Sequence, residues 1–452
     1  MVDVYEGISS VLSPEHLQEL ACSCGFMKRR SKLDPSSFID TLVFTSLEHH
    51  QLSLQDCCND LAQQSGTAIS KVAMHKRFNE QSVSFLRLVL AELIGSRLDM
   101  TDLMPACPFV RILLSDSTKF SLPLRYADKY PGYGGCRGAG SLMNIQYGLD
   151  IKNGEWERLE LTKATHNDQT YSNESLRDIQ KGDLLMRDLG YVTKKYLSGV
   201  VRAGAFFLNR LPPKWTVCHP GSAVRLDWGK LHQHLQGNKR IHSQKASISL
   251  DGQAMEVRLV ALAVPKAVWE ARIRKAAKHA RSKGVGVSDE YKVRCRFNVF
   301  ITNATENQLD AQAIINLYRI RWQVELMFKV WKSLLAVHEV KTAKMERMES
   351  MLLAKFIWIV INCKVFCSLN TEVSEQSPQN ACSVWKFFKC ARNIYQSLRG
   401  KLTNGISSFK QWCMDFIIPI VKNLRIEPKK NRKAAYELLG DIYIRMWTKD
   451  KP

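Results

Sequence analysis

The sequence contains no uninterrupted apolar run as long as the roughly 18 residues that a membrane span needs. Its most apolar segment, residues 356–365, is interrupted by Asn362, Cys363 and Lys364, a pattern typical of a buried helix. The N-terminus lacks the positive start and the small-residue cleavage site of a signal peptide. We therefore expect a cytosolic protein with no membrane partner.

A disulfide framework is missing as well. The 13 cysteines are odd in number and scattered from Cys22 to Cys413, which indicates reduced thiols. Cys22-x-Cys24 and Cys57-Cys58 leave a zinc site as an alternative, although neither pair has the spacing of common zinc modules. Low-complexity tracts and internal repeats are also absent, so we expect a globular protein.

Acidic residues are scarce relative to basic ones. There are 43 Asp and Glu against 65 Lys and Arg, which gives a net charge of +22 spread over the whole chain. This excess indicates a polyanionic partner; nucleic acid is the first choice, and an anionic membrane or an acidic protein is the alternative. A chain of 452 residues that is 45% hydrophobic is long enough for about two to four domains.

The pattern of helix and strand signals changes along the chain and divides it into five regions. The fold class that it predicts is α/β and multidomain, a mixed sheet with helices, flanked by helical regions at both ends. The regions are 1–105 (helical), 106–211 (strands and helices), 212–303 (β-rich), 304–372 (beginning with one long helix over 308–335) and 373–452 (helical).

The N-terminal region contains a candidate DNA-binding motif. Residues 53–61, a turn at Ser65-Gly66-Thr67 and residues 69–78 have the order of a helix-turn-helix whose second helix is basic. Its candidate DNA contacts are Lys71, Lys76 and Arg77. A solvated helical hairpin is the alternative.

Two aspartates each close a predicted buried strand. Residues 109–114 form an apolar run that ends before Asp116, and the strand over 183–188 ends in Asp188. Asp183, at the opposite end of that second strand, is the rival candidate. Between these strands, Asn153-Gly154 predicts a hairpin turn joining residues 141–150 and 155–162.

A very basic helix is expected over residues 272–283. Its Lys and Arg side chains have no acidic residue to offset them, which favours contact with a phosphate backbone. The candidate contacts are Arg272, Arg274, Lys275 and Lys278. A solvated helix face is the alternative.

Four functional side chains share the helix predicted over 308–335. Relative to Tyr318, the side chains Arg321, Glu325 and Lys332 follow after 3, 7 and 14 residues. At about 100° per residue this spacing places all four within roughly 60° of arc. A carboxylate in such company can hold a metal ion while its neighbours bind phosphate oxygens. A surface stripe of ion pairs is the alternative.

Asp116, Asp188 and Glu325 together supply the hard oxygen ligands that Mg²⁺ prefers. Two such ions about 4 Å apart activate an attacking hydroxyl and stabilise the leaving oxygen of an in-line phosphoryl transfer.

These motifs resemble a known family. Tyr318-x2-Arg321-x3-Glu325-x6-Lys332 is similar to the Tyr-Arg-Glu-Lys signature of DDE transposases of the insertion-sequence-four family, the Tn-five-like group. Residues 113–118 resemble the family's first catalytic block, and residues 185–191 with 207–210 resemble its second. The resemblance covers most of the chain.

The resemblance implies an RNase H-like catalytic core, interrupted by a β-rich insertion over 212–303. It implies that Asp116, Asp188 and Glu325 hold two Mg²⁺ ions, with Mn²⁺ as a substitute. Other residues would contact DNA; these are Tyr318, Arg321, Lys332 and, in the second block, Arg210.

It further implies cut-and-paste transposition in the bacterial cytosol. The transposase would nick double-stranded DNA at terminal inverted repeats, form a hairpin, and transfer the strand into target DNA as a homodimer. A DNA-binding descendant without cleavage activity and a structure-selective nuclease are the alternatives.

One departure concerns base stacking. Members of the family often carry a Trp at the start of the last insertion strand, where it stacks on a flipped base, and this chain has Phe297 there; core packing is the alternative for each aromatic residue. Phe297, Phe300 and Trp269 are the candidates for that role.

Overall fold

The computed structural model describes residues 2–29, 31–45, 52–96, 106–134, 140–152, 154–235, 240–250, 253–340, 344–376, 381–391, 402, 405–427, 438 and 441–447. The chain divides into two compact units, each assembled from three separate stretches. The first unit holds Met1–Leu103, Ser117–Thr165 and Gln323–Tyr436, and the second holds Met104–Asp116, His166–Trp322 and Glu437–Pro452. The basic cluster at 428–433 lies outside the described residues.

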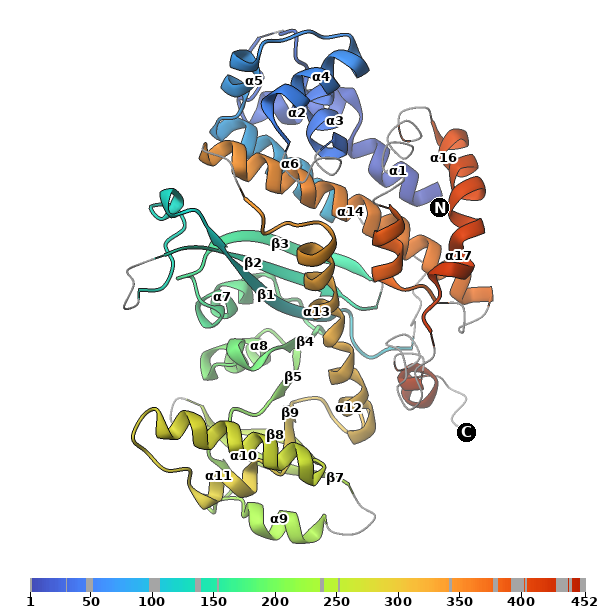
Figure 1. Cartoon of the computed structure of the whole chain (residues 1–452). Helices are drawn as coiled ribbons and strands as arrows, with labels where there is room; N and C mark the ends of the chain where they lie inside the picture. The colour runs from blue at the N-terminus through green and yellow to red at the C-terminus, as the bar shows by residue number, and fades with distance from the viewer. Residues whose placement is uncertain are drawn as a thin grey trace. The chain divides into compact units, whose positions relative to one another are not determined.

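Helices dominate the first unit (Figure 1). Their starts follow from capping side chains: Ser13 accepts from the backbone N–H of His16, and Ser53 and Asp56 form a capping box. The helical elements are α1 (Val2–Val11), α2 (Pro14–Ser23), α3 (Pro35–Thr45), α4 (Leu54–Ser65), α5 (Lys71–Arg77), α6 (Glu80–Gly95), a 3-10 turn (Leu124–Tyr126), α13 (Trp322–Lys329, beginning at the last residue of the second unit), a π-helical turn (Val330–Leu334), α14 (Met345–Gln376), α16 (Ile406–Trp412), a second π-helical turn (Cys413–Ile417) and α17 (Ile418–Leu424).

The predicted helix-turn-helix order is confirmed. Helices α4 and α5 follow one another, and Gly66 ends α4 in the left-handed conformation with φ 67°. A side chain at that position would be strained, so glycine suits it.

Helix α14 forms the centre of the first unit, where it packs against α6 and α3 (Figure 1). Among the described helices it alone is long and apolar enough to cross a membrane, but 94% of its most apolar window is buried inside the structure. The burial predicted for residues 356–365 is therefore confirmed, and we interpret α14 as a core helix.

A hairpin provides the strands that belong wholly to the first unit. Strands β2 (Ser141–Asp150) and β3 (Glu155–Lys163) pair antiparallel, as predicted. Gly154 has φ 75°, a conformation that favours glycine, while Asn153 lies outside the described residues.

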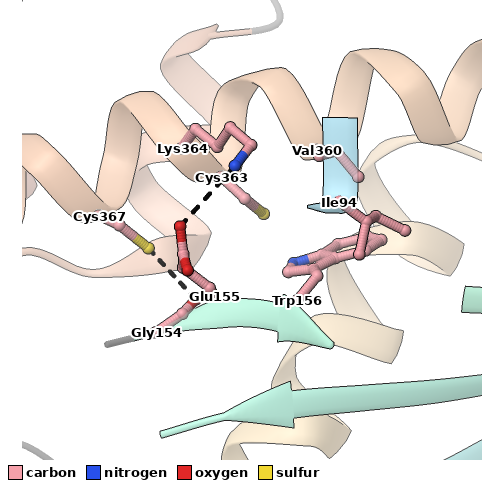
Figure 2. Close-up of a pocket in the computed structure, with 8 residues that line it drawn as sticks. All are labelled: Ile94, Gly154, Glu155, Trp156, Val360, Cys363, Lys364 and Cys367. Atoms are coloured by element: carbon pink, nitrogen blue, oxygen red, sulfur yellow. Dashed lines mark hydrogen bonds and ion pairs between the residues drawn. The ribbon is translucent and has the colours of Figure 1, made fainter. Parts of the chain in front are cut away.

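Figure 2 shows how α14 is fixed onto this hairpin. Nζ of Lys364 lies 3.8 Å from a carboxylate oxygen of Glu155, and the Cys367 thiol donates to the carbonyl of Gly154 at 3.3 Å. Burial raises the pKa of the thiols of Cys363 and Cys367, so both stay protonated. The adjoining cavity, about 10 Å³, is too small for a ligand.

The other described cysteines are free thiols as well. No disulfide joins any of the described cysteines. Burial raises the pKa of Cys57 to about 12, which disfavours the thiolate that a zinc site at Cys57-Cys58 would need.

A mixed sheet organises the second unit, in the order β1-β4-β5-β9-β8-β7-β6. Strands β1, β4 and β5 are parallel, and the pairs β5-β9, β9-β8, β8-β7 and β7-β6 are antiparallel. The strands are β1 (Ile112–Leu122, which enters this unit by its first half), β4 (Leu184–Arg187), β5 (Phe206–Arg210), β6 (Val217–Cys218), β7 (Ile241–Leu250), β8 (Gln253–Ala263) and β9 (Phe297–Thr302).

Helices cover this sheet, so the predicted α/β class is confirmed. They are α7 (Asp168–Glu174), 3-10 turns at Ser175–Asp178 and Leu189–Tyr191, α8 (Lys194–Arg202), α9 (Trp228–His234), α10 (Lys266–Arg281), α11 (Asp289–Arg294), α12 (Ala311–Ile320) and a π-helical turn (Tyr443–Trp447).

One apolar core joins the sheet to its helices. Leu197 of α8, Phe207 of β5, Leu259 of β8 and Ile301 of β9 belong to the same buried cluster. The strands of residues 212–303 therefore continue the sheet that β1, β4 and β5 begin.

Candidate active site

Asp116 lies on β1, but not where the sequence placed it. The strand was expected to end at Leu114, and it continues to Leu122. Ser115, Asp116 and Ser117 are all partly buried, and from Thr118 to Leu122 buried positions alternate with more exposed ones, as they do in a strand. Asp116 is therefore in the middle of a strand.

Asp188 directly follows β4, as predicted. Strands β1 and β4 are parallel, and their register pairs Ser115 with Arg187. Asp116 follows Ser115 on β1, and Asp188 follows Arg187 at the end of β4, so the two aspartates lie side by side. Asp188 keeps an exposed carboxylate, with 46% of its side chain accessible, against 17% for Asp116.

Asp183 forms an ion pair with Arg111. Its carboxylate is fully buried and accepts two hydrogen bonds from Arg111, at 2.9 Å from Nε and 2.6 Å from Nη2. The backbone N–H of Gln180 adds a third at 2.8 Å. This bidentate ion pair makes Asp183 a structural residue and leaves Asp188 as the candidate.

Arg321 brings the two aspartates together. Its Nη1 donates to Oδ2 of Asp116 at 3.0 Å, and its Nη2 lies 3.9 Å from Oδ1 of Asp188. The guanidinium is 14% exposed, so solvent screens these interactions only in part.

Tyr318 joins the same group from the last turn of α12. Its ring packs on Phe300 at 4.9 Å and lies 5.7 Å from the Arg321 guanidinium. Burial raises the pKa of Tyr318 to about 12; Asp188 adds to the rise, and Arg321 and Arg210 oppose it. The phenol thus stays protonated at neutral pH and can donate a hydrogen bond. Of the second-block residues, Arg210 is close enough to influence this site.

The single helix predicted over 308–335 is wrong. Helix α12 ends at Ile320, α13 runs from Trp322 to Lys329, and a π-helical turn follows over Val330–Leu334. A π turn takes more residues than an α turn, so positions beyond it lose the regular angular spacing.

Lys332 lies within the π-helical turn, whereas Glu325 precedes it on α13. Both belong to the first unit, where Glu325 is exposed on α13. Nζ of Lys332 donates to the carbonyl of Lys119 at 3.0 Å, and burial lowers the pKa of Lys332.

The residues predicted to bind DNA on α5 divide into two kinds. Lys71 and Lys76 are exposed. Arg77 is half-buried, and its Nη2 donates to the hydroxyl of Ser31 at 2.5 Å. The structure therefore gives Arg77 a role in holding α5.

The basic residues of α10 are also of two kinds, exposed ones and one that hydrogen-bonds to the chain. None of its described residues is buried, and Arg274, Lys275 and Lys278 are exposed. Arg272, in contrast, donates to the carbonyls of Cys295 and Phe297 at 3.2 Å each and to Oδ1 of Asn298 at 2.7 Å. Arg272 thus attaches the helix to β9, which corrects its assignment to the exposed basic face.

Of the candidates for base stacking, Phe297 and Phe300 are buried core residues. Trp269 is half-buried, and its Nε1 donates to the carbonyl of Lys292 at 2.9 Å. The Arg296 guanidinium covers its ring at 3.8 Å. The burial of both phenylalanines removes them as stacking candidates.

Sequence reasoning missed the support beneath Asp188. Arg187 is buried, hydrogen-bonds to Ser172 and Ser175, and stands 4.7 Å from the ring of Tyr196. Nδ2 of Asn209 donates to the Arg187 carbonyl at 3.0 Å. The only sequence signal was a charged residue inside a short apolar strand.

Asp116 and Asp188 provide oxygen atoms of the kind that a divalent cation binds. Asp116 and Asp188 direct hard oxygen atoms toward one positive group, the Arg321 guanidinium, which stands where a cation is favoured. Among the described residues, no group of three His, Cys, Asp or Glu side chains could hold a metal ion. Asp116 and Asp188 thus supply two carboxylates beside the Arg321 guanidinium.

Comparison with known proteins adds independent information. Residues 108–361 match the family described as "Transposase DDE domain". The chain is 26% identical to the transposase for insertion sequence element IS231B of Bacillus thuringiensis subsp. berliner, covering 96% of this chain and 94% of that protein. It is 28% identical to the IS231F transposase of B. thuringiensis subsp. israelensis, with coverages of 97% and 95%. It is 22% identical to the IS1151 transposase of Clostridium perfringens, with coverages of 94% and 93%.

Among solved structures, a piggyBac transposase synaptic complex with hairpin DNA covers 100% of this chain and 91% of its own, at 10% identity. Its TM-score of 0.44 is too low to support a conclusion about the fold.

Proposed function

The chain belongs to the transposase DDE domain family, and from that membership we propose that it is a cut-and-paste DNA transposase with Asp116, Asp188 and Glu325 as its catalytic carboxylates. The resemblance to insertion-sequence-four transposases is confirmed by relatives from insertion sequences that match nearly the whole chain.

One observation supports the assignment above the others. Asp116 and Asp188, 72 residues apart in the chain, end up side by side on neighbouring parallel strands and face one guanidinium. Carboxylates placed together in this way repel one another unless a cation lies between them. Asp183, the other candidate on this strand, forms a buried ion pair with Arg111.

The family implies dependence on divalent metal. We propose that Asp116, Asp188 and Glu325 hold two Mg²⁺ ions, or Mn²⁺ in their place. Bound there, the ions would activate the attacking oxygen and stabilise the leaving oxygen. Arg321 would then release Asp116 and donate to a phosphate oxygen, because a guanidinium pairs equally well with phosphate.

The proposed reaction begins when a water oxygen attacks a phosphodiester at the end of the element. The bond from phosphorus to the 3′ oxygen breaks, and a water proton passes to that oxygen, which leaves a 3′-hydroxyl and a 5′-phosphate. The 3′-hydroxyl then attacks a phosphodiester of the opposite strand: its oxygen bonds to phosphorus, the bond to the 3′ oxygen of the flanking DNA breaks, and that oxygen takes the proton, which closes a hairpin. A second water attacks the hairpin phosphorus and frees the 3′-hydroxyl again. This 3′-hydroxyl attacks a target phosphodiester and displaces the 3′ oxygen of the target strand, which leaves as a hydroxyl.

The remaining basic and phenolic side chains would bind the DNA. Tyr318 would donate a hydrogen bond to a phosphate oxygen, because its phenol stays protonated. Lys332 and Arg210 would neutralise phosphates near the cut, and the exposed residues Lys71, Lys76, Arg274, Lys275 and Lys278 would contact DNA further away.

We further infer an RNase H-like core. The parallel run β1-β4-β5 supports it, and so does the antiparallel hairpin β2-β3 of the first unit. Residues 212–303 would be its β-rich insertion, 1–105 the end-binding region, and 373–452 a dimerisation or DNA-contact region. A homodimer acting on terminal repeats and target DNA in the bacterial cytosol completes the proposal.

Cleavage of DNA that carries the element's own ends tests this function. The DNA that flanks the gene is searched for inverted repeats to define the substrate, and purified protein should nick that substrate only when Mg²⁺ is present. Binding without cleavage would instead support a DNA-binding descendant.

A further inference from the structure

Lys355 is a buried cation that the proposed chemistry does not use. It lies on α14 between Ala354 and Phe356, and all three residues are buried. Burial lowers the pKa of Lys355 to about 8, and Glu339 opposes the shift, so at neutral pH the side chain is an ammonium. An ammonium in such surroundings costs free energy unless polar groups compensate it.

The compensating groups are two backbone carbonyls of the first unit. Nζ of Lys355 donates to the carbonyls of Leu335 and Ala336, at 3.5 and 3.3 Å. These residues directly follow the π-helical turn Val330–Leu334. Leu335 caps this turn, and carbonyls at the end of a helix bear partial negative charge, which a cation stabilises. The carbonyl of Ala336 also accepts the backbone N–H of Glu339, at 3.1 Å.

The chain is strained at this point. Ala336 has φ 46°, the left-handed conformation that is unfavourable for an L residue. Surrounding contacts must hold that conformation. Lys355 provides one, and next to it Phe356 packs edge-on against the buried Trp331 of the π turn at 5.0 Å.

The segment held in this way contains Glu325 on α13 and Lys332 in the π turn. We propose that Lys355 is a positioning residue, which fixes the C-terminal end of the π turn and thereby the orientation of Glu325 and Lys332. The roles of those two residues rest on the proposed function, while the anchoring itself does not.

Lys355→Met is the variant that tests the proposal. It keeps the apolar stem and removes the ammonium, and replacing a buried charge by an apolar group of similar size is often neutral for stability. We expect an unchanged melting temperature and unchanged DNA affinity, with hydrogen exchange of the amides in residues 330–337 faster by about tenfold. Single-turnover cleavage should slow by about the same factor, because Glu325 is no longer held in place.

Asn362→Leu is the matched control on the same helix. Asn362 is also buried, but its side chain donates to the carbonyl of Trp358, at 2.9 Å, which lies on α14 itself. We expect exchange over 330–337 and the cleavage rate to match those of wild type.

Two results would overturn the proposal: unchanged exchange over 330–337 in Lys355→Met, or faster exchange with a wild-type cleavage rate. Failure of the wild-type protein to cleave DNA would contradict the proposed function, and the exchange measurement would still decide whether Lys355 anchors the turn.

Discussion

Nη1 of Arg321 lies 3.0 Å from Oδ2 of Asp116, although 205 residues separate the two in the chain. The contact joins the break between α12 and α13 to the middle of β1. It explains how two neighbouring carboxylates coexist at this position. Arg321 is consequently both the counter-ion of the aspartates and the first candidate for a phosphate contact.

Replacing Arg321 tests both roles. Arg321→Ala should slow cleavage by about 10²-fold or more, because one positioned cation at a phosphoryl centre is worth that much. Arg321→Lys should recover only part of the rate, since lysine keeps the charge but loses the two-pronged geometry. Single-turnover rates at saturating Mg²⁺ make the measurement, and an alanine variant as fast as wild type would remove Arg321 from the site.

Asp183 and Asp188 should respond in opposite ways to the same substitution. Asp188→Asn should abolish cleavage and leave the melting temperature nearly unchanged, because its carboxylate is half-exposed and lies 3.9 Å from Arg321. The Asp183→Asn substitution should lower the free energy of unfolding by about 3–5 kcal/mol, because it breaks a buried ion pair with Arg111. Thermal unfolding and cleavage assays on both variants check this, and the reverse pattern would make Asp183 the catalytic residue.

Helix α10 offers a test of DNA contact by salt dependence. Lys275→Ala and Lys278→Ala should each reduce the slope of log affinity against log salt by about one, without loss of stability. Arg272→Ala should instead lower the melting temperature, because it loses the carbonyls of Cys295 and Phe297. An unchanged slope in both lysine variants would exclude this face from the interface.

Lys355 makes the stability of the fold depend on pH. Its pKa is lowered from 10.5 to about 8, so between these values the unfolded chain holds a proton that the folded chain has released. The free energy of unfolding therefore rises with pH across that window, by at most about 3 kcal/mol, and is unaffected by this group below it. Urea unfolding at pH 7 and pH 10 should show this rise in wild type relative to Lys355→Met. An equal change in both would contradict it.

Local signals in the sequence were enough for several elements. The Asn-Gly pair predicts the hairpin that Gly154 makes with φ 75°, and the apolar strand before Asp188 is β4. Capping residues such as Ser53 predict helix starts because the cap bonds are made within four residues of chain. Such features depend only on neighbours, so a single sequence contains them.

Features that depend on distant partners were not visible. The length of β1 is set by strand pairing, which overrides the polar run from Ser115 to Thr118. The break at Arg321 follows no proline or glycine, and it coincides with the contact to Asp116. Arg272 and Lys275 are basic residues of the same predicted helix, and the sequence does not distinguish them. The structure shows that Arg272 donates hydrogen bonds to three acceptors on the chain.

The most direct test of the central claim is Mg²⁺-dependent, single-turnover cleavage of end DNA by Glu325→Ala, with DNA affinity measured alongside. Gln323→Ala on the same helix is the control and should cleave as wild type does. The account predicts that Glu325→Ala binds the DNA with nearly wild-type affinity and does not cut it at any Mg²⁺ concentration. Cleavage by Glu325→Ala at the wild-type rate would contradict the assignment of Asp116, Asp188 and Glu325 as one catalytic set.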